Sequence, residues 1–173
     1  MGRQKAEFFY AFVKELVAEG VPIDGVAFEM LAPYPPKYPN TAWETPRILD
    51  LPTYLSAVDA NVKRYAALGL KVIFSEVQVP IYIQDMDTSS AAGQAELSGR
   101  IDYQAQVYGG LMKVALANAN VIAFKTEDMT DRYSWVYNPD PYGDPGYGFP
   151  DLFDKDYLPK PAYYEVLNAL KNP

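Results

Sequence analysis

Acidic side chains stand at or near the C-terminal ends of three short apolar segments, and they are the residues best suited to chemistry in this chain. They are Glu29, Glu76 and Glu127. The sequence has no His and no Cys, which excludes thiol nucleophiles, Cys/His zinc sites and relays that pass protons through His. Acid–base chemistry must therefore use carboxylates, Tyr or Lys. The plainer alternative for each acid is a solvated side chain at the end of a strand.

The elements that would position these acids alternate along the chain. Apolar periodicity predicts helices over about 5–19, 52–68, 94–117 and 161–170, and buried strands over 25–31, 71–80 and 121–126. Between them we expect a functional rim loop over 32–50 and a second long loop over 129–160. Gly20 and Gly69 are placed to end the first two helices. Strands separated by helices predict an α/β fold with a parallel sheet. The functional residues of such sheets lie at the carboxyl ends of the strands.

The composition is that of one folded unit, and we treat residues 1–173 as a single domain. Of its residues, 49% are hydrophobic and 21% are charged, which argues against disorder. The net charge of −7, with no cluster of Lys and Arg, disfavours a nucleic-acid partner. No apolar run reaches the roughly 20 residues of a membrane helix, and we find no apolar core of a secretion signal.

Five sequence blocks occur in order along the chain: Val21–Val26, Asn61–Ala66, Ser75–Val77, Thr130–Trp135, and Leu152–Asp154 followed by Pro159–Tyr163. Together these blocks resemble the C-terminal part of family 10 glycoside hydrolases. The family consists of retaining endo-β-1,4-xylanases built on a (β/α)8 barrel. The resemblance implies a partial barrel of three parallel βα units after a first helix, a β-1,4-xylan or other polysaccharide substrate, and a secreted protein. The family's first five strands, with the Asn-Glu that carries its general acid/base, have no counterpart in this sequence.

The resemblance also assigns roles to single residues. It implies that Glu76 is the nucleophile and that Trp135 is an aromatic platform for a sugar ring. A retaining enzyme needs a second carboxyl about 5–5.5 Å from the nucleophile. Because this second carboxyl has no family counterpart here, we expect the chain alone to be inactive on xylan. We also expect no cofactor and no metal.

Rim positions depart from the family pattern. Glu29 stands where the family usually has Gln, Leu31 where it has His, Gln78 where it has Asp, and Glu127-Asp128 where it has Trp-Gly. The family's His and Asp support the nucleophile by hydrogen bonds, so their loss removes that support. We count Glu29, Gln78 and Glu127 with Trp135 as candidate substrate-binding residues. The five blocks match the family, whereas these positions at the strand ends (the rim) do not. This contrast suggests that the site has been remade for another role or has lost its original one.

Three hypotheses remain open at this point. The first is a xylanase-like fragment that is completed by an N-terminal barrel fragment. The second is a redesigned barrel piece in which Glu29, Glu76 or Glu127, or Asp128, acts as a general base or as an oxygen ligand for Ca²⁺ or Mg²⁺. The third is a non-catalytic assembly module, because three strands are too few for a barrel and leave two unpaired edges for self-association.

Two further residues have plainer structural explanations. Trp43, in the proline-rich loop, is expected to anchor that loop rather than to bind a ligand. Asp131 is expected to accept hydrogen bonds that shape its loop rather than to act as a catalytic acid.

Overall fold

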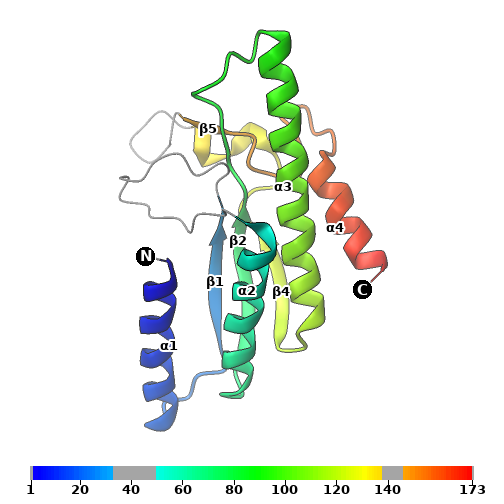
Figure 1. Cartoon of the computed structure of the whole chain (residues 1–173). Coiled ribbons are helices and arrows are strands. Elements are labelled where there is room, and N and C mark those ends of the chain that lie inside the picture. The colour runs from blue at the N-terminus through cyan, green and yellow to red at the C-terminus, as the bar shows by residue number, and fades with distance from the viewer. Residues whose placement is uncertain (1, 33–49, 138–145, 173) are drawn as a thin grey trace.

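The computed structural model describes residues 2–32, 50–137 and 146–172 of the chain (Figure 1). Its helices are α1 (Gly2–Ala18), α2 (Leu51–Ala66), α3 (Ala91–Ala117) and α4 (Pro161–Lys171). Its longer strands are β1 (Gly25–Leu31), β2 (Lys71–Gln78) and β4 (Val121–Thr126). The order of helices and strands confirms the predicted α/β succession.

The three longer strands form one parallel sheet in the order β1-β2-β4. Phe28, Phe74 and Phe124 lie opposite one another across the sheet, and the ring centroid of Phe74 is 6.4 Å from that of Phe28 and 6.2 Å from that of Phe124. Residues paired across strands point to the same face. This phenylalanine row therefore marks the face of the sheet that the helices cover.

The hydrophobic core lies between the phenylalanine row and the helices. Val72 and Phe74 of β2 are fully buried there, as are Tyr65 of α2 and Tyr108 of α3. The ring of Tyr65 packs edge-on against Phe28, with centroids 5.3 Å apart. Figure 1 shows α2 and α3 running along the sheet, with α4 beside α3. Such burial of apolar surface is the main force that holds the sheet to its helices.

The opposite face of the sheet is less well covered. Ala27, Ile73 and Ala123 lie opposite one another on it. Ala27 is exposed, whereas Ile73 and Ala123 are half-buried. Parallel sheets normally have both faces covered. The described residues thus leave open the face that would form the interior of a closed barrel.

The helix ends follow the predicted signals. Gly20 and Gly69 have φ angles of 79° and 77°, in the left-handed region that glycine tolerates at the end of a helix. Asp50 caps α2 by accepting the backbone N–H of Thr53 at 2.9 Å. Helix α3 begins a few residues before the predicted boundary, since Ser90 caps it by accepting the N–H of Gly93 at 3.1 Å.

Outside the predicted helices and strands, the structure contains short regular elements that the sequence did not reveal. Strands β3 (Ile81–Tyr82) and β5 (Tyr147–Gly148) pair antiparallel, and two 3-10 turns, η1 (Asp131–Tyr133) and η2 (Trp135–Tyr137), follow β4. Two-residue strands carry no measurable periodicity. Among the described residues, no helix is long and apolar enough to cross a membrane.

Candidate active site at the carboxyl ends of the strands

Glu76 occupies a β-bulge near the end of β2. Ser75 pairs with Glu29 and Gln78 pairs with Leu31, so β2 carries one more residue than β1 across this interval. The same excess occurs against β4, between the pairs Phe74–Phe124 and Val77–Thr126. Such bulges re-aim a side chain and often lie beside active sites.

The backbone of Glu76 is strained by this arrangement. Its φ angle is 53°, a left-handed conformation that costs a non-glycine residue roughly 1–2 kcal/mol. The side chain is exposed rather than packed between sheet and helices. Glu76 is therefore exposed near the carboxyl end of β2, and its role as a nucleophile stays a prediction.

The other predicted acids lie on both sides of Glu76. Glu29 is on β1, opposite Ser75, and the backbone N–H of Glu127 donates to the carbonyl of Val77 at 3.4 Å. Partial burial raises the pKa of Glu127, and the negative charges of Glu76, Asp128 and Glu29 raise it further, against the opposing effect of Lys125. The structure thus brings together the three acids that the sequence singled out.

A metal ion would be one way to hold such acids together. Within residues 2–32, 50–137 and 146–172, no group of three or more His, Cys, Asp or Glu is arranged to hold a metal ion.

Trp135 begins the turn η2 and is half-buried. Its indole Nε1–H donates a hydrogen bond to Oε1 of Gln78 at 2.9 Å. Its backbone N–H interacts with Asp128, an effect that lowers the pKa of this carboxyl, although partial burial raises it more. The candidate sugar platform is therefore held at both its backbone and its ring.

Gln78 ends β2 and is only 1% exposed. Its Nε2 donates to Oγ of Ser134 at 3.2 Å and to Oδ1 of Asp151 at 3.1 Å, and its Oε1 accepts the indole N–H of Trp135. The side chain contacts the aromatic platform rather than open space. A direct contact between Gln78 and substrate stays a prediction.

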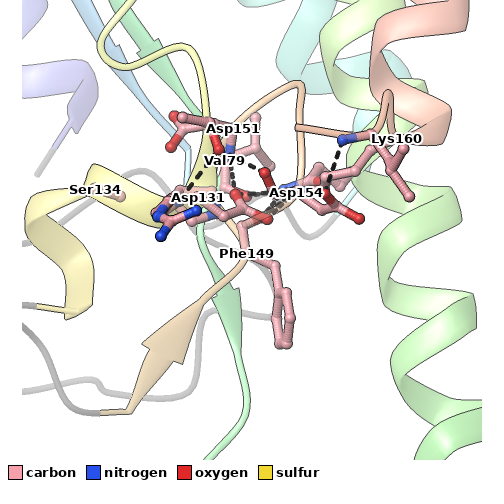
Figure 2. A network of polar contacts seen from close by, with 12 residues as sticks. Val79, Asp131, Ser134, Phe149, Asp151, Asp154 and Lys160 are labelled. Atoms are coloured by element: carbon pink, nitrogen blue, oxygen red, sulfur yellow. Dashed lines mark hydrogen bonds and ion pairs between the residues drawn. The ribbon is translucent and has the colours of Figure 1, made fainter. Parts of the chain in front are cut away.

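A buried ion pair lies next to this group of residues (Figure 2). Nζ of Lys160 is 3.1 Å from Oδ2 of Asp131 and donates to the carbonyl of Phe149 at 2.7 Å. Oδ1 of Asp131 accepts the backbone N–H of Asp151 at 2.8 Å. The prediction that Asp131 shapes its loop as an acceptor is confirmed.

Asp151 is the residue of this group that sequence reasoning missed. It is fully buried, and burial together with the charges of Asp131 and Asp128 raises its pKa to about 7, against the lowering effects of Gln78 and Lys160. It lies in a loop with no apolar periodicity, so no local pattern marked it. Lys160 did carry a signal, because a lysine at the start of a helix opposes the helix dipole and needs an acidic partner.

Helix α3 fixes the loop that carries Asp151. The hydroxyl of Tyr108 donates to the carbonyl of Pro150 at 2.8 Å, and Nε2 of Gln104 donates to the carbonyls of Val79, at 2.7 Å, and Phe149. Tyr108 itself is fully buried. Trp43, the predicted loop anchor, lies outside the described residues.

The chain is similar in sequence to known proteins over almost its whole length. The model of glycosyl hydrolase family 10 matches residues 1–169. The chain is 32% identical, over 171 residues, to endo-1,4-beta-xylanase B of Thermotoga neapolitana, covering 96% of this chain and 40% of that protein. It is 29% identical, over 164 residues, to a beta-1,4-xylanase of Dictyoglomus thermophilum, covering 94% of this chain and 41% of that protein.

Solved structures of xylanases are also similar to this chain in fold. The crystal structure of native xylanase 10B from Thermotoga maritima is similar, with a TM-score of 0.73 and 30% identity over 97% of this chain and 43% of that one. Xylanase 10B from Thermotoga petrophila, solved with xylobiose, has the same TM-score at 29% identity, over 97% of this chain and 42% of that one. The chain thus spans about 40% of the length of the two xylanases compared by sequence.

Proposed function

Because the chain belongs to glycosyl hydrolase family 10, we propose that it forms the C-terminal part of a retaining β-1,4-xylanase-like barrel, with Glu76 as the nucleophile. The observation that carries this proposal is the bulge in β2, which presents an exposed Glu76 at the carboxyl edge of a parallel sheet. Xylan is the substrate to test first, because the relatives named above are xylanases. We therefore propose that the protein acts on this polymer outside the cell.

Barrel completion is part of the proposal. A (β/α)8 barrel needs eight parallel strands, and the described residues provide three in one parallel sheet. We propose that residues 1–173 act as one unit, a helix followed by three βα units. Further strands would come from an N-terminal barrel part or from self-association of copies of this chain. They would pair with the edges of β1 and β4 and cover the open face of the sheet.

The chemistry requires two carboxyl groups. The Glu76 carboxylate would attack the anomeric carbon while a carboxylic acid about 5–5.5 Å away protonates the departing glycosidic oxygen. Water, activated by that second group, would then displace Glu76 and release the sugar. We propose that the second carboxyl comes from the completing strands. Trp135 would form the floor beneath the sugar ring.

A second candidate function follows from Glu127. Its pKa is raised by burial and by three neighbouring acids, and such a carboxyl is suited to act as a general acid or base. In that case the remade rim would carry a new reaction centred on Glu127 rather than on Glu76. A non-catalytic assembly module remains the third candidate, favoured only by the open face and edges of the sheet.

One set of proteins separates these candidates. The chain alone is compared with a chimaera in which the N-terminal part of the Thermotoga neapolitana xylanase precedes residue 1, and release of reducing sugar from xylan is measured. We expect activity only in the chimaera and a loss of roughly 10³-fold or more in its Glu76→Gln variant. The Glu165→Gln variant, on the far helix α4, is the matched control and should keep full activity.

The outcomes discriminate as follows. Robust activity of the isolated chain would contradict the need for completion. Loss of activity in Glu127→Gln, with Glu76→Gln unaffected, would favour the second candidate. An inactive but folded chimaera would favour the assembly module, and the mass of the free chain in solution would then show whether copies of it associate.

A further inference from the structure

The orientation of the Gln78 amide is fixed by what surrounds it. An indole N–H can only donate, so the Gln78 atom that faces Nε1 of Trp135 at 2.9 Å must be the carbonyl oxygen. The amide nitrogen then faces Ser134 and Asp151, at 3.2 and 3.1 Å, and donates to both. The Gln78 side chain therefore joins the aromatic platform to a buried carboxyl.

Asp151 has no hydrogen bond to Trp135, and the two residues are connected through Gln78. Its Oδ1 accepts from Gln78, and its backbone N–H is bound by Asp131. Its Oδ2 is buried and has no hydrogen-bond partner among the described residues. Among the described residues, the Gln78 amide is thus the one side-chain donor to the Asp151 carboxyl, so a change in the charge of this carboxyl acts directly on its hydrogen bond with Gln78.

We propose that Gln78 and Asp151 are positioning residues for the Trp135 indole, linked as Asp151–Gln78–Trp135, and that the charge of Asp151 sets how firmly the indole is held. This positioning role is separate from the role proposed for Glu76. Its consequence for sugar binding rests on the function proposed above. Gln78 lies two residues after Glu76, where the family's Asp would support the nucleophile. In this chain the side chain at that position supports the platform instead.

The linkage predicts a response to pH. The groups around Asp151 are the acids Asp131 and Asp128, the cation of Lys160, and the hydroxyl of Tyr108, whose own pKa is raised by burial and by both Asp151 and Asp131. Burial first, and then the two acids, raise the pKa of Asp151 to about 7. The carboxyl therefore changes charge near neutral pH.

The direction of the response follows from hydrogen-bond chemistry. A carboxylate accepts the Gln78 N–H more strongly than a carboxylic acid does. A stronger bond on the nitrogen side polarises the amide and makes its oxygen a better acceptor for the indole. The Trp135 indole N–H bond should therefore strengthen as pH rises through the range in which Asp151 ionises.

The experiment is a pH titration of the full chain, followed by two-dimensional ¹H–¹⁵N NMR of the indole groups. The sequence has two tryptophans, so the spectrum shows two indole signals, and Trp43→Phe assigns the one from Trp135. From about pH 5 to about pH 9, a range that spans the Asp151 titration, we expect the Trp135 indole proton to move downfield in a single step. Its midpoint should lie near 7.

Two variants identify the group responsible. In Asp151→Asn the step should disappear. In Asp128→Asn, the matched control, the step should remain, because that acid interacts with the backbone N–H of Trp135 and not with its ring or Gln78. A step that survives Asp151→Asn, or that is lost in Asp128→Asn alone, would overturn the proposal.

A measurement on the unaltered chain covers the case in which Asp151→Asn fails to fold. The side-chain NH₂ signals of Gln78 should titrate with the same midpoint as the Trp135 indole. A flat Trp135 signal, or different midpoints for the two residues, overturns the proposal without any variant. No xylan is present, so an inactive chimaera with a titrating indole would reject the proposed function alone, and an active chimaera with a flat indole would reject the positioning role alone.

Discussion

The ammonium group of Lys160 lies 3.1 Å from Oδ2 of Asp131, and the two side chains are only 7% and 3% exposed. Removing one partner of such a pair leaves the other as an uncompensated buried charge. We therefore expect Lys160→Met to lower the free energy of unfolding by about 3–5 kcal/mol in urea denaturation.

A matched lysine tests the role of burial in this effect. Lys155 pairs with Asp156 at 2.7 Å, but its side chain is 75% exposed. Pairs of this kind contribute about 0–1 kcal/mol, so Lys155→Met should leave the denaturation midpoint nearly unchanged. Equal losses in the two variants would show that burial does not decide the strength of the Lys160–Asp131 pair.

Asp151 predicts a loss of stability as pH rises. Its pKa in the folded chain, about 7, lies above the ordinary value of an Asp carboxyl, about 3.9, so the folded state holds this proton more tightly than the unfolded state. The resulting stabilisation is complete below the unfolded pKa and is lost as pH rises through the folded pKa. Between about pH 5 and about pH 8.5 the loss amounts to on the order of 3 kcal/mol.

Asp151→Asn isolates this contribution. The free energy of unfolding of the unaltered chain minus that of the variant should fall by this amount over the stated range, because titrating groups that do not interact with Asp151 cancel in the difference. Asp156→Asn, at an exposed position, is the control and should give a difference that does not change with pH. A flat difference curve for Asp151→Asn would contradict the raised pKa.

The fold was predictable from the sequence wherever a local signal existed. Apolar runs that precede an acid marked the strands, and Gly20 and Gly69 marked helix ends, because left-handed backbone favours glycine. The convergence of Glu29, Glu76 and Glu127 followed from parallel strands alone, since their carboxyl ends meet at one edge. These inferences needed only short stretches of chain.

The polar contacts behind the site could not be predicted in this way. Gln78 is 57 residues from Trp135 and 73 residues from Asp151 in the sequence. A hydrogen bond between such positions leaves no periodic trace, and it forms only once the sheet, the turn η2 and helix α3 are in place. The left-handed backbone of Glu76 was hidden for a similar reason, because a bulge is defined by the register of both neighbouring strands.

The left-handed backbone of Glu76 makes a reversed preference between Gly and Ala testable. In an ordinary strand, Gly is less stable than Ala by roughly 0.5–1 kcal/mol. With a φ of 53°, Ala at position 76 carries a strain of roughly 1–2 kcal/mol that Gly avoids. We therefore expect Glu76→Gly to be more stable than Glu76→Ala in urea denaturation.

Ser75 provides the control, because it precedes Glu76 in β2 and is absent from the residues with positive φ. There, Ser75→Ala should be more stable than Ser75→Gly. If the Ala variant were more stable than the Gly variant at both positions, the left-handed backbone assigned to Glu76 would be wrong.

The grouping of acids around Glu76 predicts that changing one of them alters the titration of another. The pKa of Glu127 is raised by burial and then by Glu76, Asp128 and Glu29, while Lys125 lowers it. Glu76→Gln should therefore lower the pKa of Glu127, and Lys125→Met should raise it, as measured by ¹³C NMR of its carboxyl carbon. Glu165→Gln, on helix α4, should change nothing. A pKa of Glu127 that responds to neither neighbouring variant would show that β2 and β4 hold these charges too far apart to share one site.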